Sequence, residues 1–66
     1  MKNSIKVERA KVNYTQEQLA LKIGVSRQTI NAIEQGKYNP SIILALKIAR
    51  IFDTLVDSVF ELEAKD

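Results

Sequence analysis

The spacing of apolar residues in the middle of the chain predicts two short amphipathic helices between Thr15 and Gly36, joined by a tight turn at Gly24. Apolar residues three and four positions apart share one side of a helix, and that side packs on a core. The predicted inward residues are Leu19, Ala20 and Ile23 in the first helix and Ile30 and Ile33 in the second. The pattern therefore predicts two helices held on one small core.

The starts of these two helices are marked by capping residues. Thr15 precedes the first helix, with Gln18 three positions later, which is the spacing of a capping box. Ser26 stands in the capping position of the second helix. Both boundaries are therefore set by local sequence.

The segment from Ile5 to Val12 predicts an earlier helix with an arginine in its inward stripe. Ile5, Arg9 and Val12 fall on one side at spacings of four and three. A buried arginine needs a carboxylate partner, because an unpaired buried charge costs several kcal/mol. Glu34, at the end of the second helix of the pair, is the acid that a neighbouring helix can supply, so we predict an ion pair between Arg9 and Glu34. The alternative is a solvated surface arginine.

The segments that flank these three helices are set by turn residues. Asn13 tolerates the left-handed backbone and ends the helix that begins at Ile5, and Tyr14 is expected to pack beneath the next turn. The residues from Lys37 to Ser41 form a loop, and Pro40 with Ser41 prepares the next helix start.

An apolar helix is predicted from Ser41 to about Phe52. Its expected inward face contains Ile42, Ala45, Ile48, Ala49 and Phe52, with Leu46 and Ile51 at the edges. A last short helix is predicted from about Leu55 to Val59. Alternation of apolar and polar residues from Val59 onward predicts a strand, whose available partner is the N-terminal segment near residues 2–4. The two strands would form an antiparallel ribbon that joins the termini.

Composition narrows the function classes. The 66 residues are 45% hydrophobic and 27% charged, as expected for one globular domain over residues 1–66. The chain has no Cys and no His, so metal chemistry and the commonest general base are disfavoured, and we expect no enzyme, no metal and no cofactor. No apolar run approaches the roughly 20 residues that span a bilayer, and the N-terminus has no signal-peptide core, so we expect a cytoplasmic protein without a membrane partner.

The charge is unevenly divided along the chain. Residues 1–50 carry nine Lys or Arg against three Glu, a net charge of +6, whereas residues 51–66 carry one Lys against five Asp or Glu, a net charge of −4. The basic part contains the helix pair, and the outward face of its second helix carries Arg, Gln, Thr and Asn, which suit DNA bases. This uneven charge favours an arrangement in which residues 1–50 face the phosphates of a nucleic acid and the acidic C-terminal end faces away from them. The alternative is that the unevenness has no functional meaning, since small soluble domains are often uneven in charge.

The run from Thr15 to Ser41, TQEQLALKIGVSRQTINAIEQGKYNPS, resembles the helix-turn-helix of the phage-repressor (Cro/CI or XRE) family of transcriptional regulators. The whole chain is similar to the small members related to the cytolysin repressor. This resemblance implies a mainly all-α fold, a five-helix lambda-repressor-like DNA-binding domain with its helix-turn-helix at about residues 15–36. It also implies the pair of Arg9 with Glu34 and the terminal ribbon. Where many relatives have Gly after the fourth helix, this chain has Asp53.

The resemblance implies a recognition helix at about residues 26–35 that enters the major groove. The residues expected to contact bases are Arg27, Gln28, Thr29 and Asn31. Those expected to contact phosphates are Gln16, Ser26, Lys37, Tyr38 and Asn39. Gln16 is further expected to brace Arg27, while simple loop packing is the alternative for Tyr38. Lys6, Lys11 and Lys22 are expected to act as general solvating charges.

The partners expected are double-stranded DNA, as a palindromic operator, and a second copy of the chain, with no small-molecule ligand. The dimerisation region is placed at about residues 51–64, with Ile51, Leu55, Val56 and Val59 at the interface, the alternative being that these four complete the core. The function expected is that of a sequence-specific repressor or autoregulator. The alternative is an antitoxin-like or other protein-interaction subunit.

Overall fold

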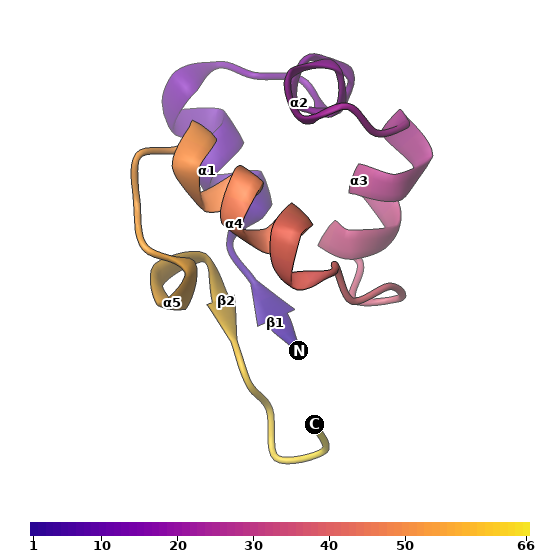
Figure 1. Ribbon diagram of the computed structural model, residues 1–66, viewed down its shortest axis with the longest axis vertical. Helices are drawn as coiled ribbons and strands as arrows, with labels where there is room; N and C mark the ends of the chain where they lie inside the picture. Colours follow the sequence, from indigo (N-terminus) through magenta and orange to yellow (C-terminus); the bar gives the residue numbers. More distant parts are fainter.

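The structure, a computed structural model, describes all 66 residues as five helices and one two-stranded ribbon (Figure 1). The elements in order are β1 (Lys2–Asn3), α1 (Ile5–Val12), α2 (Gln16–Ile23), α3 (Arg27–Glu34), α4 (Ile42–Ile51), α5 (Val56–Val59) and β2 (Phe60–Glu61). The mainly helical class and the terminal ribbon are confirmed. None of the helices has the length and apolar character that crossing a membrane requires.

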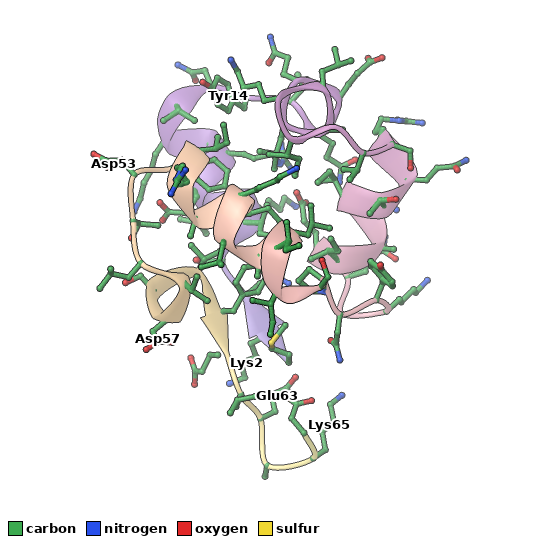
Figure 2. The ribbon with its side chains drawn as sticks, in the orientation of Figure 1. Lys2, Tyr14, Asp53, Asp57, Glu63 and Lys65 are labelled. Atoms are coloured by element: carbon green, nitrogen blue, oxygen red, sulfur yellow. The ribbon has the colours of Figure 1, made fainter.

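The ribbon brings the two ends of the chain together. β1 and β2 are antiparallel, with Lys2 opposite Glu61 and Asn3 opposite Phe60. The Met1 amino group lies 2.9 Å from a carboxylate oxygen of Glu63 and donates a 3.0 Å hydrogen bond to Asp66, and these acceptors raise the pKa of the amino group. Figure 2 shows Glu63 and Lys65 on the C-terminal segment beyond the ribbon.

The predicted caps set the helix boundaries. Thr15 accepts a hydrogen bond from the Gln18 amide, and the Gln18 side chain accepts one from the Thr15 amide, which completes the capping box. Ser26 and Ser41 cap α3 and α4 in the same way, by accepting from backbone amides. Each oxygen satisfies an amide that has no partner within its helix.

Residues in the left-handed conformation end the helices. Asn13 (φ 59°) ends α1 as predicted, and Gly24 (φ 78°) makes the turn between α2 and α3. Asp53 (φ 52°) takes this conformation after α4, at the position where the related family often has glycine. Asp is among the few residues other than glycine that adopt this conformation readily, so the turn survives the substitution.

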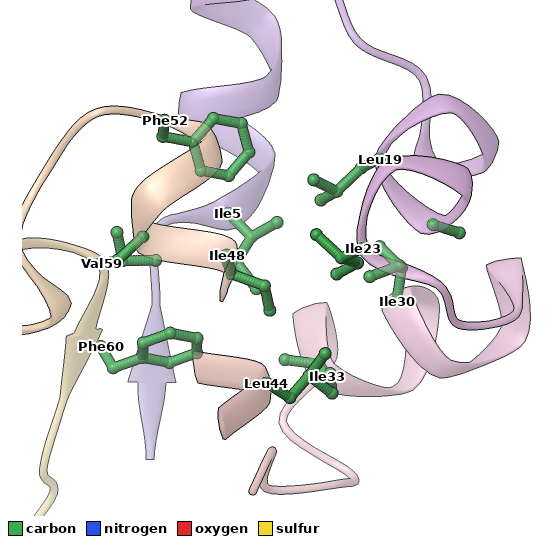
Figure 3. Close-up of a cluster of buried hydrophobic side chains, with 12 residues drawn as sticks. Ile5, Leu19, Ile23, Ile30, Ile33, Leu44, Ile48, Phe52, Val59 and Phe60 are labelled. Carbon is green, nitrogen blue, oxygen red and sulfur yellow. The ribbon is translucent and has the colours of Figure 1, made fainter. Parts of the chain in front are cut away.

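Twelve buried residues, all apolar, form the core, and α4 runs through its centre (Figure 3). The five predicted inward residues of α2 and α3 are all buried. Val59 is also buried, with 2% of its surface exposed, so it completes the core and is not available to a second copy.

Two predictions about inward faces are wrong. Ile42 is 80% exposed, and Leu44 takes its place in the core. Successive residues turn by about 100° around a helix, so Ile42 and Leu44 point to nearly opposite sides. Val12 is 44% exposed, because the core reaches α1 only at its first residue, Ile5.

Candidate nucleic-acid interface

α3 presents a polar face to solvent while its apolar face is held on the core. Ile30 and Ile33 are buried, and three of the four predicted base-contacting residues, Arg27, Gln28 and Asn31, are exposed. The helix lies at the outer edge of the molecule, next to α2 and on the side of α4 away from α5 (Figure 1). Nothing in the fold covers this face.

The fourth predicted base-contacting residue, Thr29, is half-buried and tied to the helix start. Ser26 Oγ accepts a hydrogen bond of 3.1 Å from the Thr29 amide and lies 2.9 Å from Thr29 Oγ1. One of the two hydroxyl groups therefore donates to the other within the first turn of α3. Thr29 retains its methyl group and part of the hydrogen-bonding capacity of its hydroxyl for another contact.

Arg9 and Glu34 form an ion pair that joins the first helix to the end of α3. Arg9 Nε lies 2.7 Å from Glu34 Oε2, and Arg9 Nη2 donates to Glu34 Oε1 at 3.0 Å. The two side chains are 14% and 8% exposed. The hydrogen bonds to Glu34 raise the pKa of Arg9 above its ordinary value, so the guanidinium stays charged. Its remaining arm donates to the Tyr14 carbonyl at 2.9 Å and holds the loop before α2.

Gln16 extends this pair into a network on the exposed side. Its Nε2 donates to Asn31 Oδ1 and to Glu34 Oε1, each at 3.2 Å. The expectation that Gln16 braces Arg27 is therefore wrong. The reason is geometric: Asn31 and Glu34, one turn apart on α3, are the residues that meet the first turn of α2.

The amide of Asn31 is oriented by its neighbours. Asn31 Oδ1 accepts from Gln16 and also from Gln35 Nε2 at 3.3 Å. A carbonyl oxygen has two lone pairs, so both are used. Asn31 therefore offers two N–H donors and no free acceptor, which suits a phosphate oxygen, guanine O6 or thymine O4 better than adenine, which needs both a donor and an acceptor.

The loop after α3 carries three of the predicted phosphate-contacting residues. Gly36, at φ 74°, lets the Lys37 amide return to the Ala32 carbonyl at 2.9 Å while its own amide bonds Ile33 at 3.0 Å. This pair of hydrogen bonds is a Schellman motif. It fixes the point where the exposed residues Lys37, Tyr38 and Asn39 leave the helix.

Two contributions to this region were not predicted from sequence. Asn3 Nδ2 donates to the Ile33 carbonyl at 2.8 Å, and its Oδ1 accepts from the Ile5 amide at 3.2 Å, so one side chain links β1, α1 and α3. Lys22 was expected only to solvate the surface, but its ammonium lies 5.1 Å from the centre of the Tyr14 ring. An asparagine just before a helix start can be predicted to act as a cap. Nothing in the neighbouring sequence predicts that the same side chain also bonds to a residue thirty positions away.

Comparison with known proteins identifies relatives of this chain. A family model described as helix-turn-helix matches residues 5–58. An uncharacterised HTH-type transcriptional regulator from Methanocaldococcus jannaschii is 58% identical over 60 residues, which cover 91% of each chain. YgzD of Bacillus subtilis, also described as an uncharacterised HTH-type transcriptional regulator, is 48% identical over 66 residues and the full length of both chains.

Solved structures show the same arrangement. The restriction-modification controller protein C.AhdI from Aeromonas hydrophila superposes with a TM-score of 0.76 and 28% identity, over 85% of this chain and 81% of that one. A hypothetical transcription factor from Neisseria, at 22% identity and a TM-score of 0.76, shares the fold over 82% of this chain and 61% of its own. The protein belongs to the helix-turn-helix family of transcriptional regulators, which bind DNA and are not enzymes.

Proposed function

We propose that this protein binds a palindromic site in double-stranded DNA as a homodimer and acts there as a repressor or autoregulator. One observation carries the proposal: the exposed face of α3 holds Arg27, Gln28 and Asn31 on a helix that the partly buried network of Arg9, Glu34 and Gln16 fixes in place. The side chains that hold α3 are already ordered in the free protein. Entry of the helix into the major groove therefore does not have to restrict them further.

The base contacts follow from the chemistry of each side chain. Arg27 can donate two hydrogen bonds to guanine O6 and N7, and Gln28 can pair with adenine N6 and N7. Thr29, with its hydroxyl engaged by Ser26, contributes its methyl group. Asn31 donates to a base acceptor or a phosphate because its oxygen is already occupied.

The phosphate contacts flank the recognition helix on both sides. The side chains of Gln16 and Ser26 are engaged within the protein, so these residues would use their backbone amides at the starts of α2 and α3. Lys37, Tyr38 and Asn39 would hold the strand beside the other end of α3. In Figure 2, Asp53 and Asp57 lie on the α5 side of the molecule, away from α3, which keeps these two carboxylates off the DNA.

Replacing Lys37 by alanine is expected to weaken binding to all duplexes alike. A phosphate contact carries no sequence information, and each one lost lowers the slope of log affinity against log salt by about 0.9. Titrations at several salt concentrations with cognate and random DNA measure this slope. Lys6→Ala removes the same charge from the exposed surface of α1 as a control and should leave the slope unchanged. An unaltered slope in Lys37→Ala would remove this residue from the phosphate contacts.

The dimer surface we propose lies on α4 and α5, on the side away from α3. An open groove there is lined in part by Leu46, Arg50, Asp53, Leu55 and Val56. Leu46 and Leu55 are 54% and 73% exposed, whereas the half-buried Ile51 lines a separate hollow next to Gly24. The groove combines apolar side chains with one cation and one anion, so a twofold axis could place Arg50 of each copy against Asp53 of the other.

Sedimentation at micromolar concentration is expected to give twice the 7.5 kDa mass of the chain. Leu55→Glu should yield monomers and weaken binding to a palindrome whose half-sites lie about 34 Å apart. Leu62→Glu is the matched control, since Leu62 is 78% exposed outside the groove. A monomeric parent protein, or a Leu55→Glu variant that dimerises normally, would contradict the proposed interface.

Selection of binding sites from random DNA tests the function as a whole. We expect an enriched palindrome, because each half-site is read by one α3 and a twofold dimer repeats it. A reporter driven by a promoter that contains this palindrome should then fall in output when the protein is supplied. Failure to enrich any sequence would contradict the proposed function.

A further inference from the structure

A shallow, mainly apolar hollow lies beside the base-reading residues of α3, between this helix and the loop that follows it. Its lining residues are Ser26, Gln28, Thr29, Ala32 and Tyr38. We propose that this hollow seats the C5-methyl group of a pyrimidine in the major groove, so that Ala32 and Tyr38 contribute to sequence specificity. The inference rests on the proposed entry of α3 into that groove.

The polar groups around the hollow are mostly engaged elsewhere. The Ser26 and Thr29 hydroxyl groups lie 2.9 Å apart and share one hydrogen bond, and the Ala32 carbonyl accepts from the Lys37 amide at 2.9 Å. The apolar groups of the lining residues are the Thr29 methyl, the Ala32 methyl and the Tyr38 ring. An alkyl group placed against these apolar groups would remove apolar surface from water on both sides, which favours binding.

The position of the hollow favours a base edge over any other ligand. Gln28 forms one wall and also belongs to the row of exposed donors on α3, so a base pair next to the one that Gln28 reads would bring its edge to the hollow. Tyr38 forms the opposite wall, half exposed, and the Schellman motif at Gly36 fixes the point where its segment leaves the helix. The backbone that carries both residues is therefore fixed before DNA binds.

Only one of the four standard bases matches this surface. Thymine is the base with a C5-methyl in the major groove, where cytosine has a hydrogen. Methylated cytosine carries the same methyl at the same ring position. The shared chemistry is the methyl group, and the two sources are distinguished by experiment.

Single-methyl substitution in the selected duplex tests the proposal. Exchanging thymine for deoxyuridine removes only the methyl, and at one position in each half-site we expect the dissociation constant to rise about fourfold per methyl lost. The Tyr38→Phe variant keeps the ring and should keep this ratio. In Tyr38→Ala, and in Ala32→Gln, which fills the hollow, the ratio should fall toward one. Lys6→Ala, at an exposed position on α1, serves as the control and should behave like the parent.

The source of the methyl is resolved at the same position. Duplexes with cytosine and with 5-methylcytosine are compared there, and methylation should strengthen binding by a factor similar to that between uracil and thymine. Tighter binding of thymine than of 5-methylcytosine identifies thymine as the natural occupant, and the reverse order identifies methylated DNA. A methyl effect that persists in Tyr38→Ala and Ala32→Gln would overturn the proposal.

The failure of this inference can be told apart from failure of the proposed function. If no duplex is selected, or if selection survives loss of Arg27 and Gln28, the entry of α3 into the groove is wrong. If selection depends on those two residues but no thymine responds to removal of its methyl, the hollow alone is misassigned.

Discussion

Replacing Arg27 and Gln28 together by alanine is expected to abolish discrimination between the selected duplex and random DNA while leaving the fold intact. Each bidentate base contact contributes roughly 1 to 3 kcal/mol of discrimination. Losing both should therefore reduce the ratio of specific to random affinity by at least about thirtyfold, since about 1.4 kcal/mol corresponds to a factor of ten. Non-specific binding should persist, because the phosphate contacts remain.

The fold should tolerate this change because both side chains are exposed and neither takes part in the network that holds α3. Circular dichroism and thermal unfolding should match the parent protein. Affinities for the selected duplex, for single-position variants of it and for random DNA give the discrimination directly. Lys47→Ala, which removes an exposed charge from α4, is the control. A double variant that still selects the same sequence would show that α3 is not the reading helix.

The parts of this molecule that local sequence specifies were predicted well. Thr15, Ser26 and Ser41 cap helices because a side-chain oxygen next to a free amide needs no distant partner. Asn13 ends α1 for a similarly local reason. The pair of Arg9 with Glu34 is longer in range, but it was predictable because a charge in an inward stripe requires a partner and few acids were available.

The errors arise where the sequence allows more than one solution. Residues 42–46 are all apolar, so their periodicity does not fix the rotation of α4, and Leu44 rather than Ile42 enters the core. The bond of Gln16 to Asn31, the reach of Asn3 to α3 and the hollow beside Tyr38 depend on how separate segments meet in space. Exposed polar residues carry no pattern that reveals such partners.

Arg9→Ala is expected to cause the largest loss of stability of any single change discussed for this protein. The substitution leaves the nearly buried Glu34 carboxylate with the Gln16 amide as its remaining side-chain donor, and it also removes the donor to the Tyr14 carbonyl. Removing one partner of a buried pair typically costs about 3 to 5 kcal/mol. A chain of this length has a total stability of roughly 3 to 10 kcal/mol, so the variant should unfold at a much lower urea concentration or temperature.

Three further variants distinguish a buried pair from a general effect of charge. Arg9→Lys keeps the charge but cannot form the two-pronged contact, and it should fall between parent and alanine. Replacing both partners by methionine removes the orphaned carboxylate, so the double variant should be clearly more stable than Arg9→Ala. Lys11→Ala breaks the 3.0 Å pair with Glu8, in which Lys11 is 65% exposed, and should cost at most about 1 kcal/mol.

Urea unfolding, monitored by circular dichroism, gives the free energy of unfolding of each variant. DNA titration under conditions in which each variant is still folded then shows how the loss of stability relates to binding. Because Glu34 accepts from Gln16, and Gln16 in turn orients Asn31, loss of the pair should also loosen the reading face. We therefore expect the folded fraction of Arg9→Ala to bind the selected duplex more weakly than the parent, with little change on random DNA. A loss of only a few tenths of a kcal/mol, as for Lys11→Ala, would instead mean that the pair is open to solvent and that α3 is held by its apolar face alone.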